Sequence, residues 1–111
     1  MLIMYKIFIN NPSQNSLDAI INNAKKVVSN APTDLKGTGF NASIAQSFSQ
    51  HWLRTFYEPT QTYKKTINNN FNDILLDIDS ISKHTISEEA RAIYLNVIQE
   101  YAAKIKQVYN L

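Results

Sequence analysis

The sequence contains no cysteine and, in 111 residues, only two glycines and three prolines. Without cysteine there can be no disulfide, thiolate zinc site, iron–sulfur cluster or cysteine nucleophile, while the cellular compartment stays undecided. The low glycine and proline content argues against collagen-like repeats and linker-rich chains. With 44% hydrophobic and 18% charged residues, the composition is that of a chain that folds. Its length predicts one domain spanning residues 1–111.

The net charge of the chain is small, and its apolar segments are short. Eleven basic and nine acidic residues give a net charge of +2, and lysines pair only at 25–26 and 64–65, so no nucleic-acid partner is expected. Residues 1–9 are apolar, but Lys6 interrupts them and Asn10 and Asn11 follow. No run approaches the roughly 20 apolar residues of a membrane span. We therefore expect no conventional signal peptide and no stable membrane insertion.

Helical periodicity dominates the rest of the chain. Apolar residues spaced three and four apart predict a helix over about 16–29, helical segments over 40–57 and 63–81, and a last helix whose stripe runs from 90 to 109. Asn15 or Ser16 is the expected N-cap of the first helix, and Thr85 with Glu88 has the form of a capping box before the last. Residues 1–14 form an apolar opening and a turn, and only 5–9 alternate enough for a strand.

The fold prediction is all-α. Residues 31–39 hold both glycines and predict a turn between two antiparallel helices. Pro59 lies inside the following helical pattern, so the segment is either one long kinked helix or two helices. The expected architecture is an elongated antiparallel helical hairpin with a kinked long central helix and a third C-terminal helix.

The sequence offers no recognisable active site. Phosphate-binding glycine loops and nucleophile elbows are absent, and His51 and His84 fit no metal pattern. Asp73, Asp77 and Asp79 cluster, with the first two on one helix face, but a solvated face explains them better than a cation site. We expect a non-enzymatic protein without metal or cofactor.

An apolar stripe runs along the second predicted helix in steps of four residues. Such a stripe is either core alone or core together with a protein interface, because a chain of few helices leaves part of so broad a face uncovered. Its members are the candidate partner interface: Phe40, Ile44, Phe48, Trp52 and Phe56.

The turn before this stripe resembles the signature of the LXG domain, the N-terminal targeting domain of type VII secretion toxins in Gram-positive bacteria. Leu35 and Gly37 match the motif itself. The flanking positions are matched by Gly39, Phe40, Asn41, Ala42 and Phe48. The related small WXG proteins carry tryptophan where this chain has Leu35. In outline the resemblance covers residues 15–111.

The resemblance implies a helical module that docks small WXG-type or LXG-associated helical proteins and the secretion machinery, as a homo- or hetero-oligomer. Leu35 would pack into the seam between two antiparallel helices. The chain would be secreted by a non-classical route, or lie in the cytoplasm before export. It departs from the family because it has no toxin domain and no export signal of an aromatic residue with an acid four positions later. It would thus be a short effector or a targeting remnant.

Two other classes remain open. A small bacteriocin immunity protein is also helical, mildly basic and free of catalytic residues. A phage or plasmid structural protein that self-assembles is the third possibility.

Overall fold

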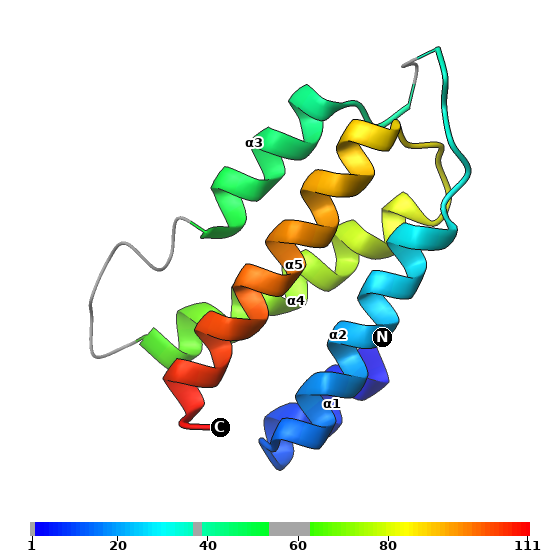
Figure 1. Cartoon of the computed structure of the whole chain (residues 1–111). Helices are drawn as coiled ribbons and strands as arrows, with labels where there is room; N and C mark the ends of the chain where they lie inside the picture. Colours follow the sequence, from blue (N-terminus) through cyan, green and yellow to red (C-terminus); the bar gives the residue numbers. More distant parts are fainter. Residues whose placement is uncertain (1, 37–38, 54–62) are drawn as a thin grey trace.

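The computed structural model describes residues 2–36, 39–53 and 63–111, which form five helices and no strand. These are α1 (Leu2–Asn10), α2 (Gln14–Asn30), α3 (Ala42–Leu53), α4 (Tyr63–Ile81) and α5 (Glu88–Tyr109), as Figure 1 shows. The all-α prediction is confirmed. The predicted kink at Pro59 lies outside the described residues. None of the described helices is long and apolar enough to cross a membrane.

The helices α2, α4 and α5 enclose most of the core, and α5 lies between α2 and α3 (Figure 1). The expected hairpin, in which α2 and α3 pack directly on each other, is therefore wrong for the described residues. α5 carries seven buried residues along its length, and this broad apolar surface accommodates a helix on either side. The radius of gyration is 13.9 Å, close to the roughly 13 Å of a compact domain of this length, and the longest axis measures 43 Å against 27 and 17 Å for the other two.

The opening segment is helical, which corrects the expectation of a possible strand at residues 5–9. Met4, Tyr5, Phe8 and Ile9 turn toward the core, whereas the intervening Ile7 is 56% exposed. The buried positions are spaced three and four residues apart, as in a helix with one face against its neighbours. These neighbours are α2 and α4.

Both predicted N-caps are displaced by two or three residues. Ser13 caps α2 in a reciprocal pair with Ser16, whose backbone N–H lies 3.1 Å from the Ser13 hydroxyl. Ser87, rather than Thr85, caps α5 by accepting from the backbone N–H of Ala90 at 3.1 Å. Thr85 is unavailable because its carbonyl belongs to a contact between two loops.

The loops that precede α3 and α5 pair with each other. Phe40 donates its backbone N–H to the Thr85 carbonyl and accepts from the Ser87 N–H, both at 2.9 Å. On the other side, the Asp34 N–H donates to the carbonyl of the buried Ile86 at 2.8 Å. These bonds fix the start of α3 against the start of α5, and the two helices run parallel from there (Figure 1).

Gly39 permits this pairing through close approach. A Cβ at this position would overlap the carbonyl oxygen of Thr85 and lie 2.9 Å from its carbonyl carbon. The Gly39 N–H donates to the Asp34 carboxylate. Leu35, expected in an apolar seam, is instead 93% exposed, so that expectation is wrong. Gly37 lies outside the described residues.

Arg91 ties α5 to the C-terminal end of α2. Its guanidinium donates to the carbonyls of Val28 at 3.0 Å and Ala31 at 2.7 Å, and to the Thr33 hydroxyl at 3.0 Å. A cation at a helix C-terminus also interacts favourably with the macrodipole. One side chain thus links α5 both to the end of α2 and to the loop that leads to α3, in addition to the backbone bonds between the loops.

Candidate partner-binding surface

Among the described residues, helix α3 is covered mainly on one side. It packs against α5, and its buried residues Ala45 and Trp52 lie seven positions apart, two helical turns along that side. Ile44, next to Ala45, is 37% exposed, and Phe48 is half-buried. The side of α3 turned away from α5 therefore keeps apolar side chains in contact with solvent.

Two hollows of about 480 and 230 Å³ lie along this side of α3. The larger is bounded by α3 and α4, and the smaller by the start of α3 and the loop after α4. Both hollows have α3 as one wall, and we call the two together the α3–α4 groove. Its lining residues are Gly39, Phe40, Ile44, Ser47, Phe48, His51, Asp73, Leu76, Asp77 and His84.

Three of the five residues expected at a partner interface line this groove: Phe40, Ile44 and Phe48. Trp52 does not, because it is 1% exposed and belongs to the core. Phe56 lies outside the described residues. The stripe thus divides between core and open surface, as its breadth of more than one row of side chains allows.

Trp52 is anchored beneath the groove by one carboxylate. Its indole Nε1–H donates to Asp77 Oδ2 at 3.0 Å. Burial raises the pKa of the Asp77 carboxyl, and nearby Asp73 adds to this effect, while the Trp52 hydrogen bond and His51 act in the opposite direction. The carboxylate therefore carries a desolvation cost that the hydrogen bond only partly offsets.

The α4 wall of the groove combines charge and apolar surface. Asp73 and Asp77 lie on one face, as their spacing predicts, and Leu76 between them is 45% exposed. Asp73 is exposed as expected, but Asp77 is half-buried, so a fully solvated face does not describe it. In the described part of the chain, no three His, Cys, Asp or Glu side chains are grouped to hold a metal ion.

The floor of the groove is aromatic. Phe48 stacks nearly parallel on Trp52 with ring centroids 6.3 Å apart, and Trp52 lies 5.9 Å from Tyr94 on α5. Tyr94 is fully buried, and its hydroxyl has no hydrogen-bond partner among the residues that the structure describes. Burial, with a smaller contribution from Asp77, raises the pKa of this phenol. The floor is rigidly packed but leaves one polar atom unsatisfied.

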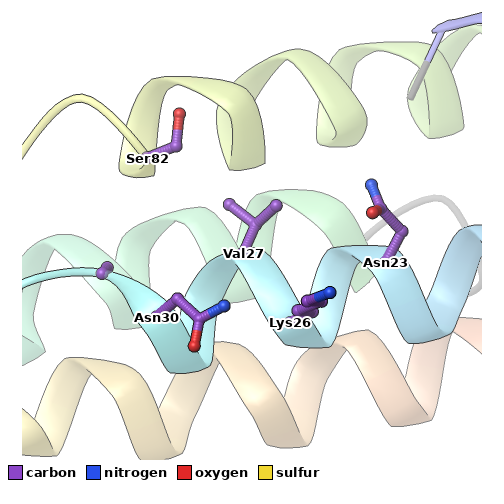
Figure 2. Close-up of a pocket in the computed structure, with 6 residues that line it drawn as sticks. Asn23, Lys26, Val27, Asn30 and Ser82 are labelled. Carbon is purple, nitrogen blue, oxygen red and sulfur yellow. The ribbon is translucent and has the colours of Figure 1, made fainter.

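Two other hollows are chemically different. Figure 2 shows one of about 350 Å³ where Asn23 and Val27 of α2 project toward the segment that holds Ser82. Its lining is mainly amide, lysine and hydroxyl side chains, without a grouped acid and base. The other, of about 480 Å³, lies at the paired loops beside Leu35 and includes Glu88 and Glu89. Neither combines exposed aromatic surface with a buried anchor.

Sequence reasoning identified the α3 side of this surface and missed most of the α4 side. Nothing in the sequence predicted that Leu76 is exposed, because a leucine within a helical pattern is usually interpreted as a core residue. His84 read as a loop residue, yet its ring lies edge-on to Phe40 with centroids 5.4 Å apart. The chain matches no family model, no curated protein and no solved structure.

Proposed function

We propose that this protein is a non-enzymatic helical interaction module that binds one helix of a partner protein in the α3–α4 groove. The observation that carries the proposal is exposed apolar surface in both hollows, with Leu76 and Phe48 lining the larger one and Ile44 and Phe40 the smaller one. Monomeric proteins bury such surface or use it, and an amphipathic helix laid in a groove is a common way to cover it. Only part of the apolar stripe on α3 is buried in the core, and the exposed part is available to a partner.

The more specific proposal is a module of type VII secretion similar to the LXG domain, a short effector or toxin-targeting segment exported by a non-classical route. Its support is the turn sequence around Leu35 and Gly39 and the apolar stripe that follows. The antiparallel helical pair that receives the partner is α3 and α4, linked through the segment that contains Pro59. Leu35, almost fully exposed, provides an additional apolar contact for such a partner.

Co-expression tests this function. The chain is co-expressed with the small helical proteins encoded beside it, and complexes are isolated by affinity and size-exclusion chromatography. We expect one of them to co-purify, and Ile44→Asp to abolish the complex because the charge would be buried under the partner helix. Ile7→Asp is the matched control, since Ile7 is also an exposed isoleucine on a helix but lies on α1.

Monomeric behaviour with every neighbour would reject the proposal. Equal loss of the complex in the Ile44 and Ile7 variants would place the interface elsewhere. Protection of bacteriocin-sensitive cells by the chain alone would support an immunity protein instead.

A further inference from the structure

The α3–α4 groove is acidic although the chain as a whole is basic. Asp73 and Asp77 line it, and among the described residues its lining includes the histidines 51 and 84 but no lysine or arginine. Elsewhere in the described residues, Glu88 pairs with Arg91 and Asp18 with Lys106. Asp73 and Asp77 have no ion-pair partner within the parts of the chain that the structure describes. The described lining of the groove therefore combines exposed apolar surface with negative charge.

Asp77 also has spare hydrogen-bonding capacity. Trp52 occupies Oδ2, and Oδ1 has no partner among the described residues. A carboxylate held in place by one bond and partly desolvated gains most from a cation that approaches its other oxygen. Asp73 lies one turn away on α4, at a rise of roughly 6 Å. The two carboxylates therefore present a pair of negative charges at helical spacing.

On the premise that the groove binds a partner helix, we infer that this helix is basic and amphipathic. Its apolar side chains cover Ile44, Phe48 and Leu76, and its lysines or arginines, one turn apart on one flank, pair with Asp73 and Asp77. Complementary charges of this kind select the partner and orient it in the groove more than they tighten binding. An acidic helix would meet repulsion at the same positions.

Trp52 is the only tryptophan in the chain and stacks on Phe48, which lines the groove, so its fluorescence reports on the packing directly beneath the groove. The probes are three synthetic amphipathic peptides of about 20 residues with the same leucine and alanine face and with lysine, glutamine or glutamate on the flanks. We expect the lysine peptide to bind about tenfold more tightly than the glutamate peptide at low salt, with the difference shrinking as salt screens the charges.

The variant Asp73→Asn should weaken binding of the lysine peptide about threefold at low salt and leave the glutamine peptide unaffected. Glu100→Gln is the matched control, because it removes the same charge from an exposed position on α5 that does not line the groove. It should leave both affinities unchanged. Asp73 is exposed, so its variant keeps the fold, which circular dichroism verifies.

The outcomes separate this inference from the proposed function. If all three peptides bind equally and Ile44→Asp abolishes binding, the basic partner is rejected and helix docking stands. If the glutamate peptide binds best, the charge assignment is reversed and the inference fails. If no peptide changes Trp52 emission, both the inference and the use of this groove are rejected.

Discussion

Two aromatic clusters lie at different levels along α5 and are covered in different ways. The first, which we call the closed cluster, is sealed by α1. Its rings pack edge to face, with Phe8 centred 6.1 Å from Phe71 and 5.2 Å from Tyr109. The second, the groove cluster, lies under α3 and is open on the side of α4. The members of the closed cluster are Tyr5, Phe8, Phe71, Tyr101 and Tyr109, and those of the groove cluster are Phe40, Phe48, Trp52 and Tyr94.

The clusters differ most clearly in their polar atoms. Tyr5 donates to the backbone carbonyl of Asn68 at 2.7 Å, and Tyr109 donates to the Asn68 side chain. In the groove cluster, Trp52 depends on a partly desolvated carboxylate, and the Tyr94 hydroxyl has no partner. In a region that only stabilises the fold, the buried polar atoms are normally hydrogen-bonded. Unsatisfied polar atoms are more often found where a surface binds a partner. We therefore assign stability to the closed cluster and propose recognition as the role of the groove cluster.

Truncating one ring in each cluster gives the largest expected contrast. Phe71→Ala should destabilise the protein by about 3–5 kcal/mol, because Phe71 is buried and contacts three other rings. Phe48→Ala should cost about 1–2 kcal/mol, since this ring is half-buried, and should weaken binding of the lysine peptide. Urea denaturation measures both. Equal losses of stability would show that the groove cluster is ordinary core.

The loop junction that holds the start of α3 should be the next most sensitive. Gly39→Ala forces the new methyl group against the Thr85 carbonyl, at an expected cost of about 1–3 kcal/mol. The amide protons of Phe40 and Ser87 should exchange faster, because their hydrogen bonds belong to this junction, while amides near the closed cluster keep their protection. Ser43→Ala, an exposed change nearby on α3, serves as the control. Unchanged exchange in Gly39→Ala would mean that the loops accommodate a side chain.

Two substitutions of Asp77 separate the effect of its hydrogen bond on stability from the effect of its charge. Asp77→Leu removes the acceptor of the buried Trp52 N–H and should cost about 1–3 kcal/mol. Asp77→Asn keeps an acceptor oxygen and removes the desolvated charge, so it should be at least as stable as the original protein at pH 7. Thermal unfolding of both variants at a series of pH values checks this.

The sign of the pH dependence follows from the raised pKa of Asp77. The folded state holds the proton more tightly than the unfolded state, so the stability that Asp77 contributes is present below its ordinary value of 3.8 and is lost as pH rises above it. The greater stability of Asp77→Asn relative to the original protein should therefore disappear below pH 3.8. An advantage that stays constant down to low pH would exclude the desolvated charge as its cause.

Local periodicity was sufficient to predict much of the fold. Helices α4 and α5 contain the apolar stripes of residues 63–81 and 90–109, because a long apolar stripe defines a helix without reference to its neighbours. Residues 5–9 are too few for the period to be read, and their helical form depends on Phe8 reaching the core. Ser87 replaces Thr85 as a cap because the Thr85 carbonyl bonds to Phe40, a contact between distant segments that no local motif reveals.

The candidate site was half predictable for the same reason. The four-residue spacing from Phe40 to Phe48 identifies one wall, since it lies on a single helix. That α4 supplies the other wall, and that α5 separates α2 from α3, depends on how the helices pack together. Asp73 and Asp77 were recognised as a pair on one face, but only the packing shows that Asp77 meets Trp52.

Removing a single hydroxyl from each cluster gives the smallest and most selective contrast. Tyr5→Phe loses a hydrogen bond of 2.7 Å and should destabilise the protein by about 0.5–1.5 kcal/mol. Tyr94→Phe removes a buried hydroxyl without a partner and should be neutral or stabilising by up to about 1 kcal/mol. Urea denaturation at pH 7 measures the two effects, which should have opposite signs.

Alkaline pH should increase the difference in stability between Tyr94→Phe and the original protein, in favour of the variant. Burial raises the pKa of Tyr94 above the ordinary 10.0, so the stability tied to its proton is complete below pH 10.0 and is lost as pH rises further. Phenylalanine carries no such proton, and the variant should unfold at higher pH than the original protein. If Tyr94→Phe were instead destabilising to the same degree as Tyr5→Phe, the Tyr94 hydroxyl would have a partner in solution. The two clusters would then be alike in their polar packing and different only in exposure.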